Sequence, residues 1–413
     1  MIVRRTCGSF EAIAAVAMLF MCGAVDAVTL EEKAQPHDCQ RVGPSDLALR
    51  SVPVRSTPGF PGVQLEVRTP FEPTAFPSSG RNYLVYELHL RNFADGPLDL
   101  KSIEVFASDA NGKPLARFEA KKLESILEPI GAGALAKEAT ERLQLASGQS
   151  VVAFLCLAFD RGVAVPAGLR HRIHLADWTA EGPVIETSHT PLRVLAPPVA
   201  GADWIADGGP GCNKSHHRVG LLVADGRATI SRRYGIDWKQ IKQEGTFSGN
   251  ALDPRSYHAY GENVLAVADG TVLAVHDGLP DNIPRTAAGF SSTLPITMDT
   301  IGGNDLTLDL GDGQFAYYAH LQAGSLRVKA GDLVRRGMVL GRIGNSGDSR
   351  EPHLHFQVMN TPSNFAAEGV PYVIDQYWVR LADDTWGKRA HELPVMGALV
   401  NFEPLQPGAI EEP

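Results

Sequence analysis

The pair His353 and His355 is the feature of this sequence that most directly indicates chemistry. Both lie in residues 351–358, which are predicted to form a β-strand, and residues i and i+2 of a strand point to the same face. Two neutral imidazoles on one face can supply a metal ligand and a general acid or base. Taken alone, the pair is equally compatible with a half-exposed strand that presents two histidines to solvent.

A carboxylate and a third histidine occur elsewhere in settings that could add to such a site. Asp237 follows Gly235 and Ile236 on an apolar stretch that reads as a strand. A buried carboxylate must find a partner, which can be a zinc ion, an arginine or a helix terminus. His320 ends a predicted strand that begins near Leu306. A single histidine at such a position more often has no functional role. Each of these residues alone is weak evidence for a functional site. Together with His353 and His355 they form a candidate metal centre.

The elements that would position these residues are short strands joined by close turns. Residues 264–275 form two apolar runs around Asp269-Gly270, the strongest short-range signal for a hairpin. Residues 328–343 repeat this texture, with glycines spaced along them, and such glycines mark bulges and close backbone approaches. Residues 202–365 are therefore predicted to form a compact, strongly bent antiparallel β domain.

The order of the motifs in this domain resembles the LytM/lysostaphin-type zinc metallopeptidases, a family of peptidoglycan endopeptidases. The matching stretches are Gly-Ile-Asp at 235–237, Val-x-Ala-x-x-Asp-Gly at 264–270, Tyr-x-His-Leu at 318–321, Gly-Asp-x-Val-x-x-Gly at 331–337, Gly-Asn-Ser-Gly at 344–347 and Pro-His-Leu-His-Phe at 352–356. The ordered set is highly specific, and it leaves the N-terminal half of the chain uncovered.

The resemblance implies a role for each matching residue. Asp237 and His355 correspond to zinc ligands, and His320 and His353 correspond to the histidines that flank the metal-bound water and assist catalysis. The chemistry is consistent with these roles, because Zn²⁺ lowers the pKa of bound water to about 7 and a nearby neutral imidazole can accept its proton. The implied activity is a zinc metalloendopeptidase that hydrolyses peptide bonds of peptidoglycan.

One position departs from the family pattern. The family has a further histidine ligand four residues before the aspartate, and in this chain that position is Arg233. An arginine is permanently charged and cannot ligate zinc. Asp237 and His355 alone would be too few, because catalytic zinc usually keeps three protein ligands.

A replacement ligand is available upstream, in the pair His216 and His217. These histidines precede a predicted hairpin around Asp225, and a three-residue loop would place position 217 opposite Arg233. A two-residue loop would turn His217 to the other face. We favour His217 as the third ligand, then His216, with Cys212 as a distant third candidate. The alternative is that the histidine pair simply begins a polar strand.

Two functions of different classes follow. The first is the zinc endopeptidase. The second is a degenerate, non-catalytic LytM-like domain that binds or activates other cell-wall enzymes, and Arg233 favours it. Four other residues of the pattern are retained, however, and a decayed site would have little reason to keep a costly polar cluster. The enzyme is therefore the preferred prediction. Its retained residues are Asp237, His320, His353 and His355.

The N-terminal half has a different texture. Residues 40–195 contain short alternating strands separated by turn signals, which predicts an immunoglobulin-like or fibronectin type III-like β-sandwich. In the strand predicted at 83–90, period two indicates one buried and one wet face. A helix is expected near 132–145, and Pro197-Pro198 with Gly201 reads as the linker to the second domain.

Composition and the two ends of the chain set the remaining limits. The 413 residues carry a formal charge of −9, which argues against nucleic acid as a partner. Residues 1–27 read as a signal peptide, so the mature protein is expected to be periplasmic or secreted, with no stable membrane span.

Cleavage would leave Cys39, Cys156 and Cys212, of which at most one pair can form a disulfide. Residues 366–413 read as a partly disordered extension.

Overall fold

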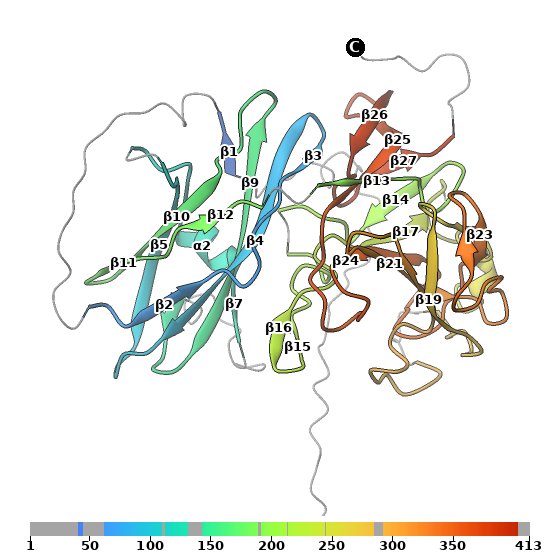
Figure 1. Ribbon diagram of the computed structural model, residues 1–413, viewed down its shortest axis with the longest axis horizontal. Coiled ribbons are helices and arrows are strands. Elements are labelled where there is room, and N and C mark those ends of the chain that lie inside the picture. The colour runs from blue at the N-terminus through green and yellow to red at the C-terminus, as the bar shows by residue number, and fades with distance from the viewer. Residues whose placement is uncertain are drawn as a thin grey trace, which may run out of the picture.

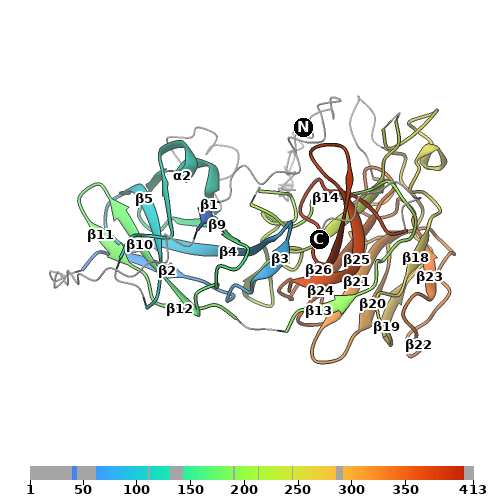
Figure 2. The ribbon, with the colours of Figure 1, turned by 90° about the horizontal axis from the view of Figure 1, so that it is seen from above.

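The computed structural model describes residues 40–43, 62–109, 112–130, 143–188, 191–212, 214–243, 245–284 and 292–403, and there the chain is nearly all β. The prediction of a mostly β protein is confirmed. The predicted signal peptide, most of the helix expected near 132–145, Cys39 and the last ten residues lie outside the described residues. Figures 1 and 2 show an N-terminal half and a C-terminal half side by side.

Two six-stranded sheets that share one hydrophobic core form the N-terminal half. One has the order β1-β9-β4-β2, with β3 and β7 paired to β4 and β9, and the other has the order β11-β10-β5-β6, with β12 and β8 paired to β10 and β5. The elements are β1 (Gln40–Val42), β2 (Leu65–Arg68), β3 (Phe76–Ser78), β4 (Arg81–Asn92), β5 (Leu98–Ala107), β6 (Ala116–Glu119), α2 (Ala120–Ile126), β7 (Leu127–Pro129), β8 (Gln144–Leu145), β9 (Ser150–Asp160), β10 (Gly168–Leu175), β11 (Thr179–Glu181) and β12 (Ile185–Glu186).

An eleven-stranded sheet organises the C-terminal half, in the order β13-β25-β27-β14-β17-β24-β21-β20-β19-β22, with β26 paired to β25. Its strands are β13 (Arg193–Leu195), β14 (Trp204–Asp207), β17 (Ile236–Gln240), β19 (Gly270–His276), β20 (Asn304–Asp309), β21 (Phe315–Leu321), β22 (Leu333–Val334), β24 (Leu354–Met359), β25 (Tyr372–Arg380), β26 (Trp386–Glu392) and β27 (Leu399–Asn401). Residues 372–401 thus contribute three strands to the same sheet as β17, β24 and β21.

Two small ribbons and a 3₁₀ turn complete this half. The elements are β15 (Leu222–Ala224) paired with β16 (Arg227–Thr229), β18 (Asn263–Leu265) paired with β23 (Val339–Arg342), and the turn η4 (Pro254–Ser256). The predicted hairpin at 264–275 is therefore wrong in its pairing. Both runs are strands, but β18 pairs with β23 whereas β19 pairs with β20 and β22. A local turn signal cannot specify a partner when distant strands bury the same apolar surface better.

Strand β4 is buried on both faces, so the expected wet face is wrong. Leu84 and Leu88 enter the core between the two N-terminal sheets. Tyr83 and Val85, on the opposite face, join the core of the C-terminal half, and Glu87 is 3% exposed. The period-two pattern is real, but it separates two cores rather than core from water.

The two halves are also joined covalently, by a disulfide between Cys156 on β9 and Cys212 in the loop after β14. The odd count of three cysteines had left this pairing open. No helix among the described residues is long and apolar enough to cross a membrane.

His171 in β10 provides a test of the packing between the N-terminal sheets. Its Nε2 lies 2.8 Å from the Tyr86 hydroxyl, and burial lowers the pKa of His171 from 6.5 to about 3. The unfolded chain therefore binds a proton below pH 6.5 that the folded protein does not bind until about pH 3, so stability falls as the pH falls through this window.

We expect this residue to reduce the free energy of unfolding by about 2 kcal/mol between pH 7 and pH 5. Urea titrations at the two pH values, on the wild type and His171→Gln, measure it. The substitution should flatten the pH dependence by that amount, and parallel curves for both proteins would contradict the assignment.

Candidate metal centre

Three neighbouring strands bring the predicted residues to one face of the sheet. Asp237 on β17 lies opposite His355 on β24, and His355 lies opposite Ala319 on β21. The alternate residues of these strands, such as Ile236 and Phe356, fill the hydrophobic core on the other face. The apolar pattern that builds the core therefore also places the carboxylate and the imidazole side by side.

His320 departs from this alternation. It follows Ala319 directly, yet its ring lies 4.8 Å from that of His353 and 6.0 Å from that of His355, between centroids. Its backbone has a φ of 65°, in the left-handed region that few non-glycine residues adopt. Gly302 accepts a hydrogen bond from its N–H, and Gly344 donates one to its carbonyl. The strained backbone at the end of β21 is thus held from both sides.

His216 and His217 reach the site from a turn rather than from a strand. The hairpin β15-β16 has a two-residue loop, Asp225 and Gly226, so the three-residue register that the sequence suggested is wrong. The histidines lie upstream of β15, and the ring of His217 packs 4.7 Å from that of His355. Strand register therefore does not decide their approach.

Gly208 explains how this turn can come so close. A side chain there would place its Cβ 2.9 Å from the rings of both His216 and His217, and its φ is +61°. Only glycine tolerates this combination without displacing the imidazoles.

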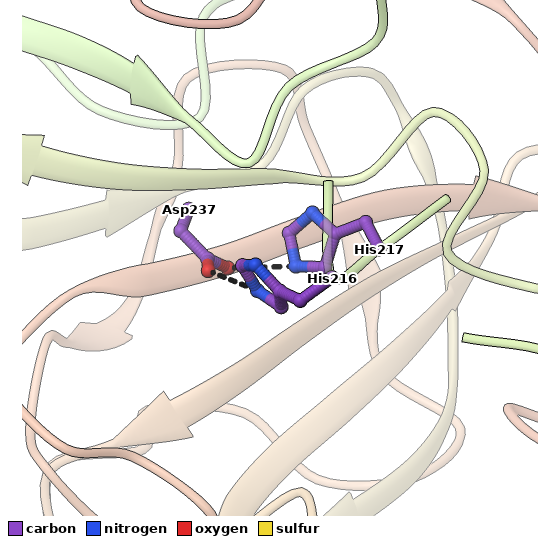
Figure 3. A group of neighbouring side chains, drawn as sticks. All are labelled: His216, His217 and Asp237. Carbon is purple, nitrogen blue, oxygen red and sulfur yellow. Dashed lines mark hydrogen bonds and ion pairs between the residues drawn. The ribbon is translucent and has the colours of Figure 1, made fainter. Parts of the chain in front are cut away.

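The Asp237 carboxylate is the centre of the cluster, as Figure 3 shows for two of its partners. Oδ1 lies 2.8 Å from His355 Nδ1, 3.2 Å from His217 Nε2 and 3.4 Å from His353 Nε2. Oδ2 lies 3.1 Å from His216 Nε2. His216 differs from the others because its side chain is 41% exposed, whereas that of His217 is 1% exposed.

Hydrogen bonds at the opposite ring nitrogen orient four of the histidines. The bonded pairs are His217 Nδ1 with the carbonyls of Gly208 and Gly235 at 3.0 Å, His320 Nδ1 with the Ser346 carbonyl at 2.9 Å, His353 Nδ1 with the Glu351 carbonyl at 2.7 Å and His355 Nε2 with Gln357 Oε1 at 2.8 Å. A carbonyl oxygen only accepts, so in the neutral form of each ring the hydrogen lies on the bonded nitrogen. The neutral tautomer then presents a lone pair at the other nitrogen, as metal ligation and proton transfer require.

Burial and mutual repulsion favour the neutral imidazole at His217 and at His320. Burial lowers the pKa of His217 to about 3, and burial together with His353 holds the pKa of His320 well below its usual value. Burial also lowers the pKa of His353, but the Asp237 carboxylate outweighs it and raises that pKa above the ordinary value. Burial raises the pKa of Asp237, yet His217 and His353 outweigh it and hold that pKa well below its usual range.

The donor set suits zinc. His216, His217 and Asp237 offer ligand atoms that all lie within 4.8 Å of one another. His217 Nε2 lies 3.2 Å from Asp237 Oδ1, close to the separation of about 3.3 Å between neighbouring donors of a tetrahedral zinc with bonds of about 2.0–2.1 Å. His355 Nδ1 lies nearer, at 2.8 Å. Two imidazoles and a carboxylate are a common ligand set for catalytic zinc.

Arg233 is directed to different partners. Its guanidinium bonds Glu87 Oε2 at 2.9 Å and Glu368 Oε2 at 2.8 Å, and it donates to the Gly369 carbonyl. Burial opposes its charge, but the two carboxylates raise the pKa of Arg233 above its ordinary value. Glu87 belongs to β4, so the residue at the histidine position of the family pattern joins the two halves of the protein.

Sequence reasoning missed several supporting groups. Gln357 could have been found, because it continues the i, i+2 series of His353 and His355 on the same strand face. The carbonyls of Gly208, Gly235 and Ser346 carry no sequence signal, because any residue supplies a carbonyl.

Comparison with known proteins finds a family match for part of the C-terminal half. Residues 256–367 match the model of peptidase family M23, and the match contains His320, His353 and His355. This chain therefore carries an M23 peptidase domain, and the resemblance to LytM/lysostaphin-type peptidases is confirmed. Asp237 and His217 lie before the matched residues.

Three curated relatives are similar to parts of the chain. Glycyl-glycine endopeptidase ALE-1 of Staphylococcus capitis is 39% identical over 75 residues, or 17% of this chain and 20% of that protein. Lysostaphin of Staphylococcus simulans is 44% identical over 69 residues, or 16% and 14%. Peptidoglycan DD-endopeptidase ShyA of Vibrio cholerae is 30% identical over 142 residues, or 34% and 30%. The matched part of this chain thus spans less than a third of each relative.

Among solved structures, the catalytic domain of lysostaphin from Staphylococcus simulans is 25% identical. The comparison covers 41% of this chain and 88% of that one, with a TM-score of 0.23.

The buried ion pairs of Arg233 generate a stability prediction. Arg233→Met would leave the carboxylates of Glu87 and Glu368 buried without their cation, and we expect it to lower the free energy of unfolding by about 3–5 kcal/mol. Urea denaturation at pH 7 measures this. The control is Arg193→Met, whose partner Asp312 has a side chain that is 90% exposed, so the loss should stay below about 1 kcal/mol. Equal losses in the two variants would contradict the interpretation.

Proposed function

We propose that this protein is a zinc metalloendopeptidase that hydrolyses peptide bonds of peptidoglycan. Asp237, His355 and His217 hold the ion, and His320 and His353 are the catalytic histidines. The proposal extends the M23 match, which covers only part of the chain, to a complete ligand set that includes an upstream histidine.

The convergence of His217 on Asp237 and His355 is the observation that carries this proposal. Its Nε2 lies 3.2 Å from Asp237 Oδ1, and its Nδ1 is occupied by two backbone carbonyls. His216 also approaches Asp237, but among the described residues no second hydrogen bond orients its ring from behind, and its side chain is 41% exposed. His217 is therefore the better third ligand.

Zinc, when bound, would supply a Lewis acid and lower the pKa of a water molecule that it holds. The chain's own residues then handle protons. His353 is held through Nδ1 by the Glu351 carbonyl, so its Nε2 is free to accept a proton and return it to the leaving amine. His320, held by Ser346, presents its Nε2 to the same region from β21.

Peptidoglycan is the proposed substrate because the relatives that match this domain are named for it or for glycyl-glycine bonds. Export to the periplasm or the cell exterior fits that substrate, and residues 1–27 are the proposed signal for it.

A non-catalytic domain that binds or activates other cell-wall enzymes is the second candidate. The presence of Arg233 at the family's histidine position favours it. Purified protein that holds zinc but releases no peptide fragments from isolated peptidoglycan would select this function instead.

The division of roles between a metal ligand and a proton acceptor predicts different outcomes for substitutions of His355 and His353. His355→Ala should abolish both zinc content and release of peptidoglycan fragments, because it removes a ligand. His353→Ala should abolish fragment release while zinc is largely kept, because it removes only the proton acceptor. Elemental analysis and a dye-release assay on the same samples measure both. Loss of zinc in both variants, or in neither, would contradict this assignment of roles.

The choice between the upstream histidines can be tested by zinc affinity. Loss of a hydrogen bond behind a metal ligand typically weakens metal binding by about 10–100-fold. We expect His217→Ala to weaken zinc binding by more than this, because it removes a direct ligand. His216→Ala is the matched control and should retain near wild-type affinity in a competition titration with a chromophoric chelator. The reverse order would make His216 the ligand.

A further inference from the structure

The segment that carries His217 is tied at several points to the N-terminal half of the protein, in addition to the carbonyls of Gly208 and Gly235 that orient the His217 ring. His216 and His217 lie in a turn, whereas Asp237 and His355 are fixed by the ladder of the central sheet. The turn's own backbone bonds are local, such as that from the Val219 N–H to the Ser215 carbonyl. Its position must therefore come from tertiary contacts on either side of the histidines.

Arg218, the residue directly after His217, makes the first of these contacts. Its guanidinium is 2% exposed and donates to the carbonyls of Tyr86 on β4 and Leu155 on β9. These two residues are cross-strand partners in the N-terminal sheet. The guanidinium also lies 5.5 Å from the centroid of the Phe154 ring, on the same strand.

The same guanidinium bonds back to its own loop. Nη1 donates to the carbonyls of Gly211 at 3.3 Å and Cys212 at 3.1 Å. Arg218 therefore links the beginning and the end of the loop to two strands of the other half. The planar guanidinium donates to four carbonyls, which fixes the orientation of the Arg218 side chain. The flexible ammonium group of a lysine would not reproduce this arrangement.

Two more tethers precede the histidines. Cys212 forms the disulfide to Cys156, which is the neighbour of Leu155 on β9. Lys214 donates to the carbonyl of Leu127 and lies 3.3 Å from a carboxylate oxygen of Glu128, both on β7. The contacts to β4, β7 and β9 thus bracket His216 and His217 on both sides.

We propose that the N-terminal half is a structural part of the metal centre, in which Arg218 and the Cys156–Cys212 disulfide position His217 for zinc. Arg218 is a positioning residue, because it acts through its neighbour and does not reach the ion. The affinity for zinc then depends on strands that lie outside residues 256–367, and on an oxidised disulfide. This inference rests on the proposed function, since it concerns the same ion.

Zinc affinity, measured by competition with a chromophoric chelator, tests the proposal on the full-length chain. Arg218→Met should weaken zinc binding by about 10–100-fold, the range typical of lost support behind a ligand. Replacement of both disulfide cysteines, as Cys156→Ser with Cys212→Ser, should weaken it in the same direction. Arg218→Lys keeps the positive charge but not the planar guanidinium, and its affinity for zinc should lie between those of the wild type and Arg218→Met.

A matched control separates positioning from general loosening of the two halves. Glu392 on β26 accepts a hydrogen bond from the Ser79 N–H of the N-terminal half, remote from β17 along the sheet order. Glu392→Ala removes this acceptor and should leave the dissociation constant for zinc unchanged. Melting temperatures without zinc are recorded for every variant, so that each titration is made on folded protein.

A double-mutant cycle gives the decisive readout. In a His217→Ala background, Arg218→Met should change zinc affinity by less than about 3-fold, because the ligand that Arg218 positions is already absent. Equal effects of Arg218→Met in both backgrounds, or unchanged affinity in Arg218→Met and in the cysteine variant, would overturn the inference. If Arg218→Met does not fold, the cysteine variant and Arg218→Lys carry the same cycle. Failure of the wild-type protein to bind zinc would instead overturn the proposed function.

Discussion

A carboxylate buried in a protein interior must be met by positive charge or by several donors, and Asp237 imposes this requirement on the C-terminal half. Imidazoles from β24, from the end of β21 and from the turn before β15 surround it. Four of the five rings, all but that of His216, are oriented from behind by a backbone carbonyl or by Gln357, so the cluster depends on many parts of the fold at once.

The same requirement recurs where the two halves meet. Glu87 and Glu368 are buried, and Arg233 bonds one oxygen of each carboxylate, while Arg218 donates mainly to carbonyls. The arginine that replaces the family's histidine is thus engaged in joining the halves rather than in blocking the site. A buried ion pair is weak support for stability in itself, but loss of one partner is expensive, so the interface and the loop that carries His217 are coupled to the sheet.

Much of the candidate site followed from local patterns. The i, i+2 spacing of His353 and His355 and the apolar runs around Asp237 predicted strands, and the motif order predicted their family. Pairing was less accessible. The strands at 264–275 pair with other partners, and β4 is buried on both faces, because a period-two pattern reports the alternation of side chains and not what covers each face.

The amino-acid sequence by itself determined the residue types of the centre, the spacing that puts His353 and His355 on one strand, and the absence of a histidine at position 233. Only the tertiary structure shows that His216 and His217 both approach Asp237, because they reach it from a turn with no periodicity to read. It also decided that Cys156 pairs with Cys212 and that Arg233 faces Glu87. Each of these contacts joins residues distant in the chain, whose meeting depends on how the two sheets pack rather than on local propensity.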